Sequence, residues 1–140
     1  MKTLYYILII TIVAVIMSAC KKIDGTCTPV GFTSSHVFSK DGGSIIFRGH
    51  YDTSEWVFHS LAIDEKDIPL FKEEPSIKLH YDSQIPPKII KIEGAWFVIE
   101  RINNITIKVS VSPSDIHRKL DIEIRHLNCY ESIKIIQDKI

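Results

Sequence analysis

Two copies of the tripeptide His-Tyr-Asp are the first residues in this sequence whose types and spacing could do chemistry. They are His50-Tyr51-Asp52 and His80-Tyr81-Asp82. Residues two apart in an extended strand share a face, so each copy presents an imidazole and a carboxylate on one side. Two such pairs brought together could bind a transition metal. No helical or loop spacing enforces that meeting, and we therefore expect no metal site and no cofactor.

Catalytic motifs are the second kind of chemistry to consider. The sequence contains no nucleophile elbow, no glycine-rich phosphate loop and no zinc-protease motif. The paired acids Glu73 and Glu74 lie in a charged stretch that is typical of a solvated connection. Basic and acidic residues number 17 each, and no long run of one sign indicates a nucleic-acid-binding face. We expect a non-catalytic protein that does not bind nucleic acid.

Aromatic side chains are the remaining candidates for ligand binding, because an exposed ring can stack on the apolar face of a sugar. Trp56, which begins a predicted strand, and Tyr51 and Tyr130, which lie in predicted turns, are the candidate platforms. Tyr81 and Trp96 complete the set of rings considered. Each has a structural alternative, since the tryptophans also suit a core and the two turn tyrosines could cover the ends of the fold.

The first twenty residues have the pattern of a targeting segment. A basic residue, Lys2, precedes the almost wholly apolar residues 4–17, and two small residues follow before Cys20. A run of this length suits a signal peptide and is short for a membrane span, which needs about 20 residues. A buried core helix is the alternative, but the run lacks the polar face with a period of 3.6 residues that such a helix shows.

The last four residues of that segment, "MSAC", resemble the bacterial lipobox. The resemblance implies cleavage before Cys20 and lipidation of Cys20, which would hold the protein on a membrane through its acyl chains. An ordinary secreted protein that is cut nearby is the alternative. We expect residues 1–19 to be a lipoprotein signal-peptide helix, residues 20–31 to be the lipidated cysteine and a polar tether, and residues 32–140 to be the folded domain.

The other two cysteines form an even pair once Cys20 is assigned to the lipid. Disulfides persist outside the cytoplasm, so Cys27 and Cys129 could be bridged. Such a bridge would tie the start of the mature chain to a late hairpin. Two unpaired thiols are the alternative.

A period of two residues dominates the chain after residue 32. In residues 105–111 isoleucine and valine alternate with threonine, lysine and serine, and residues 120–125 repeat the pattern. Both patterns are typical of half-buried antiparallel strands. Further strands are predicted at 44–48, 55–63, 76–81, 88–92, 95–100 and 132–137, and the proline-containing residues 64–75 are predicted to be a long connection. Seven or eight short strands with turns between them predict an all-β, immunoglobulin-like antiparallel β-sandwich.

The order of these segments resembles the BACON domain, an immunoglobulin-like sandwich found in lipoproteins and glycan-degrading proteins of the Bacteroidetes. The segments that carry the resemblance are "FSKDGGSIIF" (38–47), "EGAWFVIE" (93–100), "ITIKVSVSPSDIHRKLDIEI" (105–124) and "YESIKIIQ" (130–137). Arg118 and Gln137 stand where that family commonly has an arginine and a closing glutamine. The resemblance implies carbohydrate binding and leaves open, as the alternative, a domain that serves only as a spacer.

Lipobox and resemblance together predict a lipid-anchored module of the cell envelope, carried by the outer membrane. Its expected partners are the membrane, through the anchor, and a glycan or an envelope protein. The alternative function is a structural spacer or a protein-interaction subunit that uses an exposed strand edge. Residues 21–24 contain one acid, Asp24, and do not decide between the periplasmic and the surface face of the membrane.

Overall fold

The computed structural model describes residues 27–139, so the expected signal-peptide helix and Cys20 lie outside the described residues. Within residues 27–139, no helix is long and apolar enough to cross a membrane. All regular structure there is β-strand. The strands are β1 (Ser34–Phe38), β2 (Gly43–Arg48), β3 (Val57–Ile63), β4 (Lys66–Pro69), β5 (Lys78–Tyr81), β6 (Ile89–Glu93), β7 (Phe97–Asn103), β8 (Thr106–Val111), β9 (Arg118–His126) and β10 (Cys129–Gln137).

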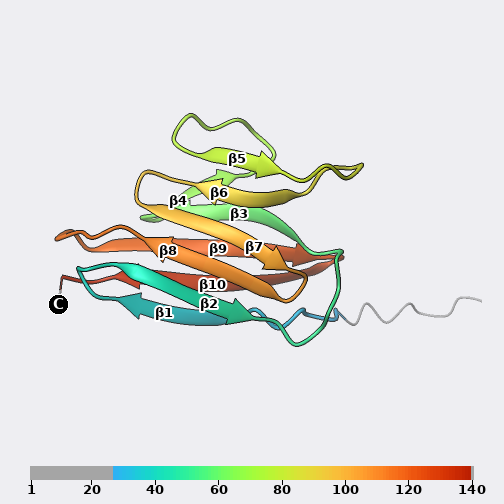
Figure 1. The fold of residues 1–140 in the computed structure, drawn as a ribbon, viewed down its shortest axis with the longest axis horizontal. Helices are drawn as coiled ribbons and strands as arrows, with labels where there is room; N and C mark the ends of the chain where they lie inside the picture. Colours follow the sequence, from blue (N-terminus) through green and yellow to red (C-terminus); the bar gives the residue numbers. More distant parts are fainter. Residues whose placement is uncertain (1–26, 140) are drawn as a thin grey trace, which may run out of the picture.

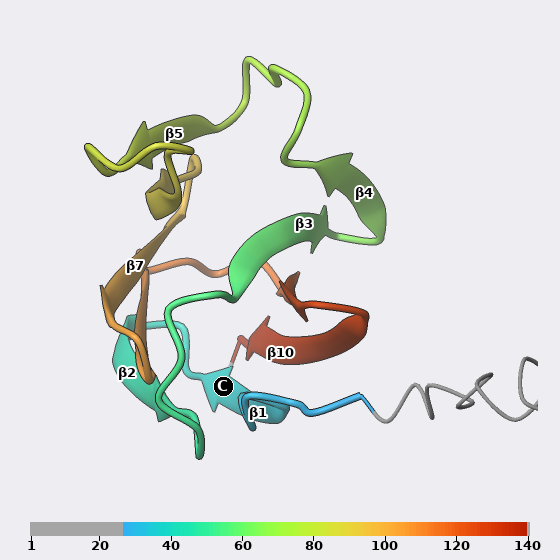
Figure 2. The same cartoon turned by 90° about the vertical axis from the view of Figure 1, so that its right-hand side faces the viewer.

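The strands form two five-stranded sheets that pack face to face (Figures 1 and 2). The first sheet has the order β1-β10-β9-β3-β4 and the second β2-β8-β7-β6-β5. All neighbours are antiparallel except β1 and β10, which are parallel. Strands β2, β8 and β7 correspond to strands B, E and D of an immunoglobulin fold, and β3, β9 and β10 to C, F and G. The predicted β-sandwich is therefore confirmed.

Alternation within the late strands builds the core, as the sequence predicts. Leu120, Ile122 and Ile124 of β9 are fully buried, and the residues between them face solvent. In β8 the buried side chains Ile107 and Val109 alternate in the same way with partly exposed ones. Side chains of this kind from the two sheets meet in one apolar cluster. Their burial supplies the main stabilising free energy, at about 25 cal/mol per Å² of apolar surface.

Residues 27–139 contain ten strands, more than the seven or eight expected, because two edge strands were not predicted. β1 has a polar sequence, and only Phe38 of it is buried. β4 lies inside residues 64–75, which were predicted to be a connection without a strand. Asp64 and Glu65 have φ angles of 48° and 70° and make a tight turn, after which β4 pairs back along β3. The two positive φ angles are those of a type I′ hairpin turn, whose usual glycine or asparagine is absent here.

Residues 27–31 were predicted to belong to the tether, and this boundary is wrong. Val30 is fully buried, and its carbonyl oxygen accepts hydrogen bonds from the backbone N–H groups of His50 and Tyr51. A disulfide joins Cys27 to Cys129 at the start of β10, with the two Cα atoms 5.1 Å apart. The segment is therefore part of the folded domain.

Candidate functional site

Trp56 is a core residue, which removes it from the candidate ligand platforms. Its side chain is fully buried and packs edge-on against Phe32 and Phe58, with ring centroids 5.1 and 5.3 Å apart. Its indole N–H donates a 2.6 Å hydrogen bond to the carbonyl oxygen of Asn104. The indole N–H thus has a hydrogen-bond partner, and the ring is enclosed in the core, so it offers no face to a ligand.

Arg101 closes the solvent side of the same tryptophan. Its guanidinium carbon lies 3.7 Å from the ring centroid of Trp56, and its N–H groups donate to the carbonyl oxygens of Trp56 and Ser54. Partial burial lowers the pKa of Arg101, and the negative charge of Asp82, which by itself raises this pKa, offsets only part of that effect. The guanidinium therefore fixes the connection between β2 and β3 over the core.

The two tyrosines that were predicted to lie in turns are exposed, as a ligand platform requires, but the prediction is wrong for Tyr130, which lies in strand β10. Tyr51, 58% exposed, lies in the connection after β2. Tyr130, 55% exposed, lies on the outer face of β10, where its ring meets the imidazole of His59 edge-on at 5.2 Å. Trp96, also a candidate ring, lies in the turn before β7 and is 8% exposed.

The two His-Tyr-Asp tripeptides do not assemble a site. Within residues 27–139, no three histidine, cysteine, aspartate or glutamate side chains are grouped so that they could hold a metal ion. The carboxylate of Asp82 instead accepts hydrogen bonds from the backbone N–H groups of Gln84 and Lys88. It shapes the turn between β5 and β6, a common use of aspartate in a loop.

An open concave site lies at the end of the β4–β5 connection. Figure 2 shows this connection crossing from one sheet to the other. The site is a pocket of about 520 Å³. Its lining comes from the end of the connection and from β5: Glu73, Glu74, Pro75, Ile77, Lys78, Leu79 and Tyr81.

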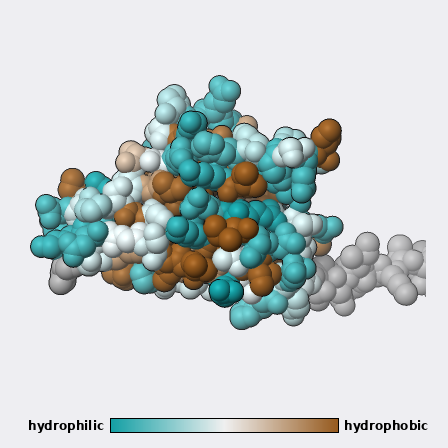
Figure 3. Space-filling model, viewed as in Figure 1, coloured by the Kyte–Doolittle hydropathy of each residue, from teal (hydrophilic) through white to brown (hydrophobic). Residues whose placement is uncertain are grey.

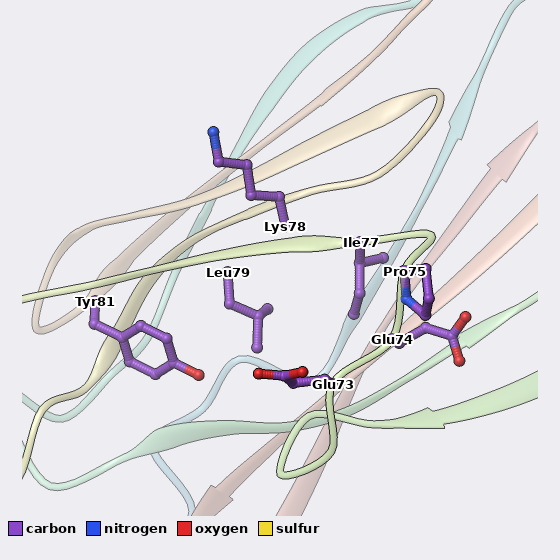
Figure 4. A pocket seen from close by; sticks show the side chains of 7 residues that line it. All are labelled: Glu73, Glu74, Pro75, Ile77, Lys78, Leu79 and Tyr81. Atoms are coloured by element: carbon purple, nitrogen blue, oxygen red, sulfur yellow. The ribbon is translucent and has the colours of Figure 1, made fainter.

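The period of an extended strand decides which of these side chains enter the pocket. Ile77, Leu79 and Tyr81 alternate along the chain and share one face, which in Figure 4 is the side on which the Glu73 carboxylate also lies. Lys78 projects from the opposite side of the strand in the same view. Leu79 and Ile77 also pack against the core, so the floor of the pocket is anchored.

Glu73 and Glu74 have different surroundings, although they are neighbours in sequence. Glu74 accepts a 3.1 Å hydrogen bond from the hydroxyl of Ser76, and its backbone carbonyl accepts one from the N–H of Ile77. Glu74 therefore shapes the connection. Glu73 lines the same pocket as Tyr81, and in Figure 4 its carboxylate lies below Leu79, on the side of the strand to which the Tyr81 ring also points. An anionic acceptor and a phenol beside an apolar floor suit a polyhydroxylated ligand.

The sequence named Tyr81 among the candidate rings, but nothing in it pointed to this pocket. Tyr81 is 51% exposed and ends the strand predicted at residues 76–81. Glu73, the acid that lines the same pocket, comes before that strand. The signal that was present is the alternation of Ile77, Leu79 and Tyr81, which places them on one face. The position of Glu73 depends on how the connection folds back.

An ion network covers the outer side of the neighbouring strands. Glu93 of β6 lies 2.5 Å from the ammonium of Lys91 and 3.1 Å from Nε2 of His80. The hydrogen bond from Lys91, and then that from His80, lowers the pKa of Glu93 to about 2. The same contact raises the pKa of Lys91. These charges hold β5 against β6 on the face opposite the pocket.

Comparison with known proteins finds a solved structure that shares the fold. No family model and no curated protein matches the chain. The NMR structure of a protein from Bacteroides thetaiotaomicron aligns with a TM-score of 0.57 at 17% sequence identity, over 86% of this chain and 96% of that one. At that identity the likeness shows a shared fold alone, so the similarity to the BACON domain remains a resemblance in sequence pattern.

Proposed function

We propose that this protein is a non-catalytic, lipid-anchored module of the outer membrane that binds a glycan at the pocket formed by β5 and the β4–β5 connection. The observation that carries the proposal is the half-exposed ring of Tyr81 in that pocket, which Leu79 and Glu73 also line. The ring and the leucine would contact the apolar face of a sugar, and the carboxylate would accept hydrogen bonds from its hydroxyl groups.

Two features of the sequence support the cellular part of the proposal. The lipobox-like residues before Cys20 favour lipidation, and the resemblance to the BACON domain favours a glycan as the ligand. Labelling of growing cells with an alkyne analogue of palmitate tests the anchor. We expect the wild-type protein to be labelled and the Cys20→Ala variant to lose the label, and a Cys20→Ala variant that is still labelled would exclude Cys20 as the lipidated residue.

A glycan array probed with the full-length protein in detergent tests the ligand. We expect binding to at least one glycan, and we expect Tyr81→Ala to weaken it roughly tenfold or more, as the loss of a stacking ring does. Tyr130→Ala is the matched control, because Tyr130 has a similar exposure on the outer face of the other sheet. Its binding should equal that of the wild type.

The possible results separate the functions. Equal losses in the two variants would place the site elsewhere, and no binding to any glycan at high protein concentration would contradict the glycan proposal. The second result would favour the alternative of a spacer or a protein-interaction subunit.

A further inference from the structure

The four edge strands of the sandwich differ in how they are protected from pairing with another chain. Folded proteins block sheet edges with short strands, prolines, lysines and bulges, because an open edge is a template for a further strand. β4 has four residues and ends at Pro69. β5 also has four residues, begins with Lys78 and has a register shift between His80 and Tyr81. Both edges at this side of the sandwich are therefore protected.

The edges on the opposite side, β1 and β2, lack these devices. β1 pairs with β10, and β2 pairs with β8, in each case without a register shift. Neither strand contains proline or lysine, and the one charged residue of β2 is Arg48 at its end. Each also carries an exposed apolar residue, Val37 at 58% and Ile46 at 53%. Two regular, unprotected edges thus lie on one side of the molecule (Figure 2).

An open groove of about 320 Å³ runs between β1 and β2. It is lined by Gly31, Phe32, Thr33, Ser34, Ser35, Ile45, Ile46, Phe47, Arg48 and His50. Among the described residues that line it, Arg48 and His50 are the ionisable ones, and none is an acid. The carboxylate of Glu131, which is not among them, is taken up by hydrogen bonds from the backbone N–H groups of Gly31 and Phe32. The groove therefore favours an acidic partner over a basic one.

The pairing of β2 with β8 determines which backbone N–H and C=O groups of β2 point to β8 and which point to the open side. Gly49 donates to the carbonyl oxygen of Ile105 just past the end of the strand, which marks a hydrogen-bonded pair. Such pairs alternate along an antiparallel ladder, so Phe47 and Ile45 also bond to β8. The N–H and C=O groups of Ser44, Ile46 and Arg48 then point to the open side. This edge offers a regular set of donors and acceptors to a new strand.

We propose that the edge of β2 binds an extended acidic segment of another polypeptide by adding it as a strand to the second sheet. Neighbours across a strand pair share a face. Alternate residues of the bound segment would therefore lie beside Ile45 and Phe47 and be apolar. The residues between them would lie on the face of Ile46 and Arg48, and an acidic residue would suit the position beside Arg48. The outer face that this strand would extend is shown in Figure 3, where apolar patches are separated by hydrophilic side chains.

The test uses the full-length protein in detergent and a fluorescein-labelled peptide in which valine and glutamate alternate. Fluorescence anisotropy should show binding that weakens with added salt, and a peptide with lysine in place of glutamate should not bind. Ile46→Pro removes an N–H that faces the open side and spares the bonds to β8, so the fold should remain. We expect Ile46→Pro to weaken binding roughly tenfold or more at an unchanged melting temperature.

Arg48→Glu is a second test of the proposal, which can be used if the Ile46→Pro variant does not fold. We expect it to abolish binding of the glutamate peptide, whereas Lys66→Glu on the protected edge of β4 is the matched control and should have no effect. Failure of the glutamate peptide to bind, or equal binding by wild type and Arg48→Glu, would overturn the proposal. Sedimentation that shows a dimer of the chain, lost in Ile46→Pro, together with no peptide binding, would assign the edge to a second copy instead.

Discussion

The carboxylate of Glu131 accepts a 2.7 Å hydrogen bond from the backbone N–H of Val30, which is 101 residues earlier in the chain. The same carboxylate accepts hydrogen bonds from the N–H groups of Gly31 and Phe32, at 2.8 and 2.7 Å. Glu131 is 6% exposed, so these bonds form away from bulk water. One buried anion thus satisfies three consecutive donors that lie before the first strand.

Replacing Glu131 should be among the most destabilising single changes at a polar residue. Glu131→Ala leaves three donors without their partner, and we expect a loss of about 3 kcal/mol in the free energy of unfolding, measured by urea denaturation. Glu131→Gln keeps one acceptor oxygen and should lose less. If Glu131→Ala is as stable as the wild type, the segment does not depend on this carboxylate.

The disulfide between Cys27 and Cys129 should stabilise the folded domain, because it restricts the conformations open to the unfolded chain. It spans 102 residues of sequence, and closing a loop of that size contributes about 4–5 kcal/mol in the chain-entropy model. A variant with serine at both positions should be destabilised by that order in urea unfolding. Thiol titration of denatured, unreduced protein is the companion measurement, and two free thiols from residues 27 and 129 would contradict the pairing.

Glu93 should titrate well below an ordinary glutamate. Its folded pKa of about 2 lies below the usual 4.5, so its ion pairs contribute stability at pH values above 4.5, and this contribution is lost as the pH falls from 4.5 to 2. The contribution is small because the network is at the surface. In ¹³C NMR titrations, Lys91→Met should raise the Glu93 pKa more than His80→Asn does. An ordinary Glu93 pKa in the wild type would show that the ion pairs do not persist in solution.

Trp56 should matter for stability and not for ligand binding. Trp56→Phe keeps most of the apolar ring but loses the hydrogen bond to Asn104 and the surface under Arg101. We expect a loss of about 1–2 kcal/mol in thermal or urea unfolding and unchanged glycan binding. A folded Trp56→Phe variant with weakened glycan binding would return this residue to the ligand site.

The late strands could be predicted from sequence because their side chains alternate between the core and solvent. Ile122 and Ile133 face each other across β9 and β10 and are both fully buried, and each lies in a segment with a clear period of two. β4 could not be predicted in this way. Its residues read as a charged, proline-ended connection, and only pairing with β3 makes them a strand.

The candidate site was less predictable than the fold, because it depends on contacts between distant parts of the chain. Trp56 follows polar residues and could have been exposed, and the rings of Phe32 and Phe58 decide that it is buried. The burial of Glu131 was not predicted, because the last predicted strand began at residue 132. Extending the alternation of Ile133 and Ile135 backwards by one step places Glu131 on the buried side.

The disulfide also determines how the domain would carry a mechanical load. A pull on the chain at residue 27 enters the fold through Cys129, at the start of β10. β10 is bonded on both sides, to β1 and to all nine residues of β9. The force would therefore reach a strand that is paired on both sides, without first passing through the five-residue edge strand β1.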